Sequence, residues 1–192
     1  IELFGTEPKL LPFLNMPIQS GSAEVLNRMN RPYSLELYMD IVDKLRAVRP
    51  DIQISSDFIV GFPGETESQF DETLDVVKQV RYINSYSFKY SPRPQTSAAA
   101  MPDQIPENIK KERLARIDNL LNDIQREFNT ECIGKTMLCL CEGPDKTGKN
   151  LIYRTPYMQQ CVVIAPNGNI NKMANIVITD ANKSSLRGKI VD

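Results

Sequence analysis

Residues 55–70, "SSDFIVGFPGETESQF", pass from an apolar strand through a glycine-rich turn into a helix. The apolar, β-branched residues before the turn predict a buried strand of a parallel sheet. Two glycines and one proline within residues 61–64 stop that strand and allow a tight turn with little side-chain bulk. Thr66 and Gln69 have the spacing of a capping box, so we expect a helix to begin there. α/β proteins bind ligands at such strand ends, which makes this turn a candidate ligand site; a plain turn between strand and helix is the alternative.

Strand-like and helix-like segments alternate on both sides of this turn. Residues 12–18 are apolar and strand-like, and Ser22 is placed to cap a short helix. An amphipathic helix is predicted from Ser34 to just before Pro50. After the next helix, the alternating residues 83–91 predict a third strand. This β-α-β-α-β order, with connections of helix length, predicts an α/β fold with parallel strands and right-handed crossovers.

The pattern changes in the last third of the chain. Residues 107–131 carry an apolar stripe at helical spacing, and Gly134 marks the end of that long helix. Beyond it, short strands alternate with turn signals, such as residues 145–148 and Asn167-Gly168. These features predict a small antiparallel β-barrel.

We therefore expect two domains, over residues 1–129 and 130–192, and they differ in charge. The first carries 15 basic and 19 acidic side chains, whereas the second carries eight basic and five acidic ones. A mildly basic barrel suits contact with an RNA backbone, although so small an excess is also normal for a solvated surface.

The composition excludes several kinds of chemistry. The 192 residues include no histidine, which removes histidine triads, histidine zinc ligands and imidazole bases. The four cysteines all lie in the predicted barrel region, and Cys139 and Cys141 share one face of a strand. We expect them to act as small apolar residues, with no metal site. No apolar run reaches the roughly 20 residues of a membrane span and no signal peptide is recognisable, so the sequence predicts a cytoplasmic protein.

Five segments in a fixed order carry a family resemblance. They are "LNMPIQSGSAEVLNRMNRPY" (14–33), "SSDFIVGFPGETESQFDETL" (55–74), "SFKYSPRPQTSAAAMPDQIP" (87–106), "KKERLARI" (110–117) and "KSSLRGKIVD" (183–192). Together they resemble the methylthiotransferase family of radical S-adenosylmethionine (SAM) enzymes, over essentially the whole chain. The resemblance implies the second half of a radical SAM partial (β/α) barrel, followed by a TRAM domain, an OB-like β-barrel that binds RNA.

Family members also carry two sets of three cysteines, each holding one [4Fe-4S] cluster. Neither set occurs in this sequence. The resemblance therefore implies that the cluster ligands and the remaining strands lie upstream of Ile1, and that this piece contains no catalytic or metal-ligating residue and is inactive alone.

The resemblance implies an enzyme that adds a methylthio group to a tRNA nucleoside. One SAM supplies the methyl group, and a second is cleaved reductively to a 5′-deoxyadenosyl radical, which requires a reducing partner. The "MNRPY" and "FKYSPRP" segments favour N6-dimethylallyladenosine beside the anticodon as the substrate, modified at C2. Sibling enzymes act on threonylcarbamoylated adenosine in tRNA or on a ribosomal protein. Two alternatives of other classes are a non-enzymatic RNA-binding module and a Schiff-base barrel enzyme that uses Lys89.

The resemblance also implies which residues approach the ligands. SAM is expected near Gln19, Ser20, Ser22, Ile59, Val60, Gly61, Glu65 and Lys89. The strand end at residues 89–91 is expected to approach the adenine or the target nucleotide. RNA contacts are expected from Arg93, Arg154 and Tyr157, with weaker support for Tyr153 and Gln159.

Plainer roles stay open for several of these residues. Gln19 and Ser20 could satisfy a turn, Glu65 could bond the amides of a helix start, and Arg93 could be an ordinary surface arginine. The sequence also departs from the family pattern at Gln95 and Pro32, where glycine is usual. These two departures concern local loop geometry.

Overall fold

The computed structural model describes residues 1–164 and 170–191. Two compact units divide the chain: an α/β unit of residues 1–10 and 14–121, and a barrel unit of residues 11–13 and 122–192. The predicted Asn167-Gly168 turn lies outside the described residues.

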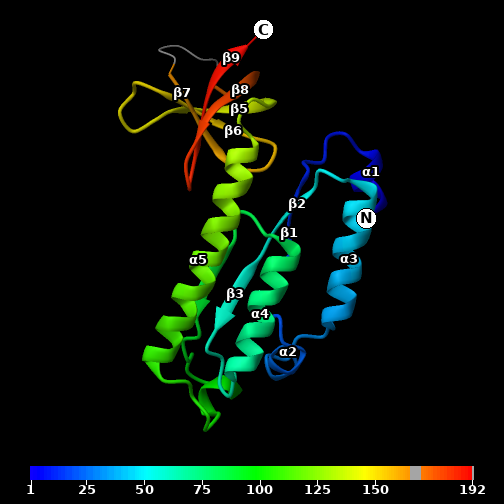
Figure 1. Cartoon of the computed structure of the whole chain (residues 1–192), viewed down its shortest axis with the longest axis vertical. Helices are drawn as coiled ribbons and strands as arrows, with labels where there is room; N and C mark the ends of the chain where they lie inside the picture. The colour runs from blue at the N-terminus through cyan, green and yellow to red at the C-terminus, as the bar shows by residue number, and fades with distance from the viewer. Residues whose placement is uncertain (165–169, 192) are drawn as a thin grey trace. The chain divides into compact units, whose positions relative to one another are not determined.

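The elements before the barrel follow one another as helices and short strands (Figure 1). In chain order they are α1 (Glu2–Thr6), β1 (Phe13–Asn15), α2 (Ala23–Arg28), α3 (Leu35–Val48), β2 (Gln53–Ser55), β3 (Asp57–Val60), α4 (Glu67–Val80), β4 (Tyr86–Lys89), the 3₁₀ helix η1 (Ser97–Ala100) and α5 (Glu107–Glu131).

The strands of the α/β unit are parallel where their direction is defined. In the β3–β4 pair, Asp57 lies opposite Tyr86 and Val60 opposite Lys89. Gln19 forms a parallel bridge with Phe58. The prediction of parallel strands joined by helices is therefore confirmed for these segments.

The predicted start of α4 is also confirmed. The Thr66 hydroxyl accepts a hydrogen bond from the Gln69 amide at 3.2 Å, and the Gln69 side chain accepts one from the Thr66 amide at 3.0 Å. This capping box satisfies two backbone donors that the first helical turn leaves free. The helix consequently begins directly after the glycine turn.

The barrel unit contains a closed five-stranded barrel in the order β5-β6-β7-β9-β8. Its strands are β5 (Thr136–Pro144), β6 (Leu151–Arg154), β7 (Gln160–Val163), β8 (Met173–Ala181) and β9 (Leu186–Val191). Four neighbouring pairs are antiparallel, but β7 and β9 are parallel. The barrel thus differs from the wholly antiparallel one expected, because β8 intervenes in the chain and two reversals return β9 to the direction of β7.

The four cysteines lie inside the barrel unit. Cys132, Cys139, Cys141 and Cys161 are free thiols, each at most 1% exposed. Burial raises the pKa of Cys139 to about 12 and that of Cys161 to about 11. The Cys139 and Cys161 thiols therefore stay protonated at neutral pH, and all four cysteines pack as small apolar groups. Within residues 1–164 and 170–191, no group of three or more metal-ligating side chains is placed to hold an ion.

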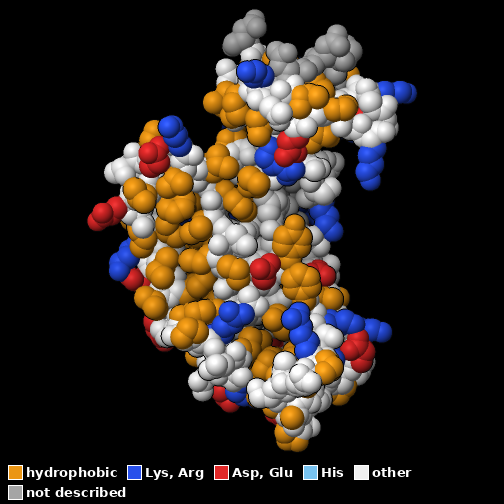
Figure 2. Space-filling model, turned by 180° about the vertical axis from the view of Figure 1, so that it is seen from behind, with side chains coloured by type: hydrophobic (Ala, Val, Ile, Leu, Met, Phe, Trp, Pro, Cys, Tyr) orange, Lys and Arg blue, Asp and Glu red, His pale blue; other side chains and the backbone are white. Residues whose placement is uncertain are grey.

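Apolar side chains are also exposed on the α/β unit. Tyr86 and Phe88 project from β4 with 66% and 54% of their surface exposed. On the face seen in Figure 2, hydrophobic side chains form extended orange areas between the charged ones. Contiguous apolar surface of this kind commonly contacts other molecules.

Among the described helices, none combines the length and apolar composition that crossing a bilayer requires.

The end of α5 is fixed to the barrel by one buried amide. Asn129 is 1% exposed, and its Nδ2 donates to the carbonyl oxygens of Asn182 at 2.8 Å and Lys183 at 3.3 Å. Its Oδ1 accepts from the side chains of Gln125 at 2.8 Å and Gln159 at 2.6 Å. Because all its partners lie in the barrel unit, this amide joins the helix end, the segment before β7 and the β8–β9 turn.

Replacing Asn129 by alanine should therefore destabilise the barrel unit. The Asn129→Ala change leaves buried donors and acceptors without partners, which should lower the free energy of unfolding by about 2–3 kcal/mol. Urea unfolding followed by circular dichroism measures the loss. Asn119→Ala, the same change at an exposed position of α5, should stay within about 0.5 kcal/mol of the parent. Equal effects of the two substitutions would show that the amide network contributes little.

Candidate functional site

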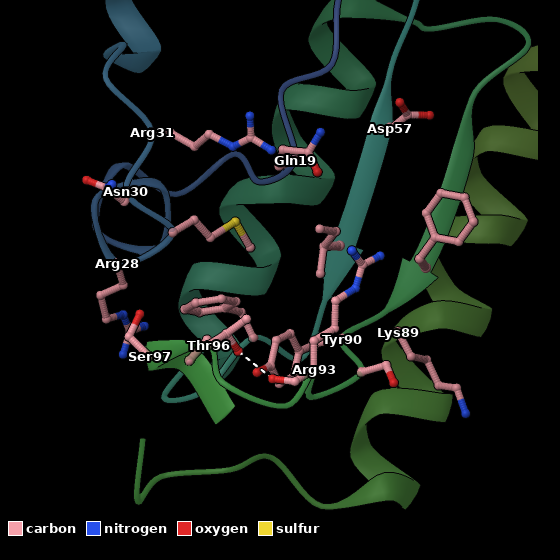
Figure 3. A pocket seen from close by; sticks show the side chains of 16 residues that line it. Gln19, Arg28, Asn30, Arg31, Asp57, Lys89, Tyr90, Arg93, Thr96 and Ser97 are labelled. Carbon is pink, nitrogen blue, oxygen red and sulfur yellow. Dashed lines mark hydrogen bonds between the residues drawn. The ribbon is translucent and has the colours of Figure 1, made fainter. Parts of the chain in front are cut away.

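A pocket of about 810 Å³ lies beside strands β3 and β4. Four segments line it: Gln19, the end of α2 and the following loop at residues 28–31, Asp57 and Ile59 on β3 with Phe62 beyond it, and residues between 88 and 98. Figure 3 shows these side chains converging from separate parts of the α/β unit. The pocket therefore forms where the chain leaves two parallel strands, the usual ligand position in α/β proteins.

Three of the residues expected near SAM line this pocket: Gln19, Ile59 and Lys89. Gln19 has a positive φ of 74°, and it is held by hydrogen bonds from its amide to the Asp57 carbonyl at 3.0 Å and from the Ile59 amide to its own carbonyl at 2.9 Å. These bonds attach Gln19 to the adjacent strand, and its side chain lies at the pocket wall. Ser91 and Arg93, expected near the nucleotide and RNA, line the same pocket.

The other five residues expected near SAM are buried or engaged elsewhere. Val60 is fully buried in the core. The Ser20 hydroxyl lies 3.2 Å from the Thr73 hydroxyl and accepts from the Ser22 amide at 3.2 Å. Ser20 and Ser22 thus satisfy a tight turn, which is the plainer role considered for Ser20.

Gly61 and Glu65 form the turn itself. The Gly61 amide donates to Glu65 Oε2 at 2.7 Å, and Gly61 and Gly64 have positive φ values of 73° and 74°. A Cβ at Gly61 would lie 2.2 Å from Cγ of Lys110, so the Lys110 side chain from α5 occupies the space that glycine leaves open. The Lys110 side chain, which belongs to the same α/β unit, therefore packs against the exposed backbone of Gly61.

Glu65 makes a buried ion pair with α5. Its Oε2 accepts from Arg113 Nη1 at 2.9 Å, and the side chains are 1% and 6% exposed. Arg113 Nη1 also donates to the Glu65 carbonyl at 2.9 Å. Burial raises the pKa of the Glu65 carboxyl above its ordinary value, while the Gly61 amide and the Arg113 guanidinium oppose the rise. The pair thus fixes the turn to the helix.

The barrel residues expected to contact RNA already have partners within the barrel unit. Arg154 donates to both carboxylate oxygens of Glu142, at 2.9 and 2.8 Å, and to the Met158 carbonyl at 2.9 Å. The Tyr157 ring packs edge-on against Phe128 at 5.3 Å between centroids. Of the two residues with weaker support, Tyr153 is 2% exposed and Gln159 is 3% exposed. These side chains are structural parts of the barrel in this arrangement.

The structure adds pocket residues that the sequence reasoning did not select. Arg28 is the last residue of α2, Asn30 and Arg31 follow that helix, and Phe62 follows β3. Their positions at or just after the ends of regular elements, on the loop side of a parallel sheet, were the available signal. Side-chain direction within those loops could not be read from spacing.

The chain is similar both to a broad superfamily and to individual named enzymes. Residues 3–77 match the Radical SAM superfamily. Over all 192 residues the chain is 50% identical to a protein named tRNA-2-methylthio-N(6)-dimethylallyladenosine synthase from Rickettsia conorii and 48% identical to one from Rickettsia felis. Its identity to the synthase from Rickettsia bellii is 49% over 191 residues. The resemblance to radical SAM methylthiotransferases is thereby confirmed along the chain, which spans 43% of the length of these curated relatives.

Removing the arginine of the buried pair should destabilise the α/β unit strongly. Arg113→Met leaves Glu65 buried without its cation, so the free energy of unfolding should fall by about 3–5 kcal/mol near pH 7. Arg113 opposes the rise in the Glu65 pKa that burial causes, so removing Arg113 raises the folded-state pKa further, and ionising Glu65 then destabilises the variant more than the parent. The loss should therefore be smallest at low pH and grow as the pH rises through that pKa.

Urea unfolding across about pH 5 to 7 measures this dependence. Arg126→Met, the same change at an exposed pair on α5, should cost less than about 1 kcal/mol at every pH. A loss for Arg113→Met that does not change with pH would refute the assignment to Glu65 ionisation.

The departure from glycine at residue 95 should carry a measurable strain. Gln95 adopts a φ of +68°, a conformation that costs a side chain about 1 kcal/mol and costs glycine little. We expect Gln95→Gly to raise the free energy of unfolding by about 0.5 kcal/mol, after glycine's greater unfolded-state entropy is subtracted. Gln95→Ala retains the Cβ and should give no gain. Thermal unfolding of both variants distinguishes backbone strain from loss of the glutamine side chain.

Proposed function

We propose that this chain is part of a radical SAM enzyme that adds a methylthio group to C2 of N6-dimethylallyladenosine in tRNA. The observation that carries the proposal is the 50% identity across all 192 residues to a synthase named for that product. The match of residues 3–77 to the Radical SAM superfamily supports the same chemistry. Modification of tRNA also agrees with the cytoplasmic location expected from the sequence.

The pocket in the α/β unit suits a ligand such as SAM. It combines apolar wall residues, Ile59 and Phe62, with polar ones, Gln19 and Lys89. We infer that these four residues line the bound SAM, and that Ser20, Ser22, Val60, Gly61 and Glu65 act by holding the wall in place. SAM supplies a transferable methyl group and, when cleaved reductively, an organic radical. The backbone of Gln19 is fixed by its hydrogen bonds to β3, and this sets where its side-chain amide begins.

The residues of this chain do not fit an iron–sulfur cluster. Such clusters need several accessible thiolates in one place, whereas the four thiols here are buried in the barrel unit with raised pKa values for Cys132, Cys139 and Cys161. We therefore propose that the [4Fe-4S] clusters of the whole enzyme are held by residues outside this chain, and that the chain alone is inactive.

We further propose that residues 130–192 form a TRAM-type, OB-like domain that binds RNA, following the radical SAM portion at residues 1–129. A closed five-stranded barrel with one parallel pair supports this assignment. Exposed lysines at positions 135, 172 and 189 are available for phosphate contacts. Arg154 and Tyr157 would need to exchange Glu142 and Phe128 for RNA in order to contribute directly.

The Schiff-base alternative lacks support from the contacts. Lys89 donates to Glu107, so its amine is held as a paired ammonium rather than as a free nucleophile. The same ion pair places Lys89 at the pocket edge as a charged group.

Nucleoside analysis of tRNA tests the proposed function. Disrupting the gene that encodes this chain should abolish 2-methylthio-N6-dimethylallyladenosine and leave N6-dimethylallyladenosine to accumulate, as measured by mass spectrometry of digested tRNA. Reintroducing the intact gene should restore the modified nucleoside. Unchanged 2-methylthio-N6-dimethylallyladenosine, together with loss of the methylthio group from threonylcarbamoylated adenosine, would assign the protein to the sibling activity.

A further inference from the structure

We propose that Arg31 and Arg93 form a phosphodiester-binding pair in the pocket, which grips the RNA backbone beside the nucleotide being modified. This inference rests on the proposed function and adds to it a position for the RNA on the α/β unit. The two arginines come from different loops, and Figure 3 shows both side chains extending into the pocket.

The charges of Arg31 and Arg93 are not neutralised by neighbouring carboxylates. The pocket lining carries Arg28, Arg31, Lys89 and Arg93 but a single carboxylate, Asp57. Arg28 lies 3.7 Å from Asp103, and Lys89 is paired with Glu107. In the parts of the chain that the structure describes, Arg31 and Arg93 have no carboxylate within 4.0 Å and no side-chain hydrogen bond. Two guanidinium groups thus face the pocket with free donors.

The backbone of each arginine is also held in place. Arg31 precedes Pro32, and its amide donates to the Leu26 carbonyl at 3.0 Å. Arg93 lies between two prolines, and its carbonyl accepts from the Thr96 hydroxyl at 2.8 Å. Because proline fixes its own φ and restricts the residue before it, little backbone freedom is lost when either arginine binds a ligand. The pair is therefore prepared to bind an oxyanion.

The same pocket contains a buried hydroxyl without a hydrogen-bond partner among the described residues. The Tyr90 hydroxyl is buried and, among the described residues, has no partner, while the Tyr90 ring packs edge-on against Phe62 at 5.2 Å. Buried polar groups are nearly always paired, so this hydroxyl is available to a polar atom of a bound molecule. An aromatic wall beside two free guanidinium groups suits a nucleotide, which presents a flat base and a charged phosphate.

The charge of the pocket favours RNA phosphate over the SAM carboxylate as the bound oxyanion. SAM carries a sulfonium, an ammonium and one carboxylate, so it brings a net positive charge into a pocket that already has an excess of cations. A phosphodiester brings only negative charge, and the planar guanidinium fork matches two of its oxygens. Binding RNA thus lowers the repulsion among the lining cations.

RNA titration of the full 192-residue chain tests the pair. The probe is a fluorescent stem-loop RNA of about 17 nucleotides, titrated between about 50 and 200 mM salt. Arg31→Gln and Arg93→Gln should each weaken binding about tenfold at the lowest salt. The double variant should reduce the slope of log affinity against log salt by about 0.7, the value for one single-strand phosphate contact. Lys111→Gln, which removes an exposed cation outside the pocket, should change neither quantity.

A second RNA identifies the bound group. Uncharged methylphosphonate linkages in the loop should weaken binding to the parent chain but have little further effect on the double variant. The two changes are not additive if the arginines bind the replaced phosphate, because either change alone removes the same contact. Parent-like RNA binding by the double variant would overturn the pair while leaving the tRNA analysis to judge the proposed function. Loss of SAM binding in equilibrium dialysis, with RNA binding unchanged, would make the pair a carboxylate site and also overturn it. No RNA binding by the parent chain would overturn it as well.

Discussion

The buried contact between Glu65 and Arg113 is the constraint on which the candidate site depends. The carboxylate accepts from the Gly61 amide at one end of the turn and from α5 through Arg113. Taking both charges out of water costs free energy that their attraction only partly recovers. The role of the pair is therefore to position these segments more than to stabilise the fold. Through its contacts with Gly61 and Arg113, Glu65 fixes the turn after β3 against one position of α5.

That geometry explains why glycine is required at Gly61. Once Arg113 is fixed, Lys110 lies one turn earlier on the same helix and packs its aliphatic stem against the glycine backbone. The Lys110 ammonium then reaches the Tyr90 carbonyl at 3.4 Å. The turn after β3 and the segment after β4 are thus held from behind by one helix. Residues of both segments line the pocket, whereas no residue of α5 does. The helix therefore influences the shape of the pocket by supporting the segments that form its wall.

The sequence predicted the local parts of this arrangement and missed the long-range ones. The capping box at Thr66 and the shared face of Cys139 and Cys141 depend on spacings of two or three residues, which the chain itself dictates. Glu65 and Arg113 are 48 residues apart, and no local pattern encodes their contact. The barrel was predicted, but its parallel pair requires knowing which strands become neighbours. For the same reason the pairing of Arg154 with Glu142 could not be foreseen.

The division of roles among the pocket cations follows from the same packing. Arg28 and Lys89 are restrained by Asp103 and Glu107, which lie on the segment leading into α5 and on its first turn. Arg31 and Arg93 lie on proline-bounded loops that no acidic residue of this segment reaches, so their charge stays available. One helix and its leading segment thus neutralise the cations closest to them and leave the two loop arginines charged. A pocket built this way has fixed walls and an uncompensated positive field, which attracts a polyanion before any specific contact forms.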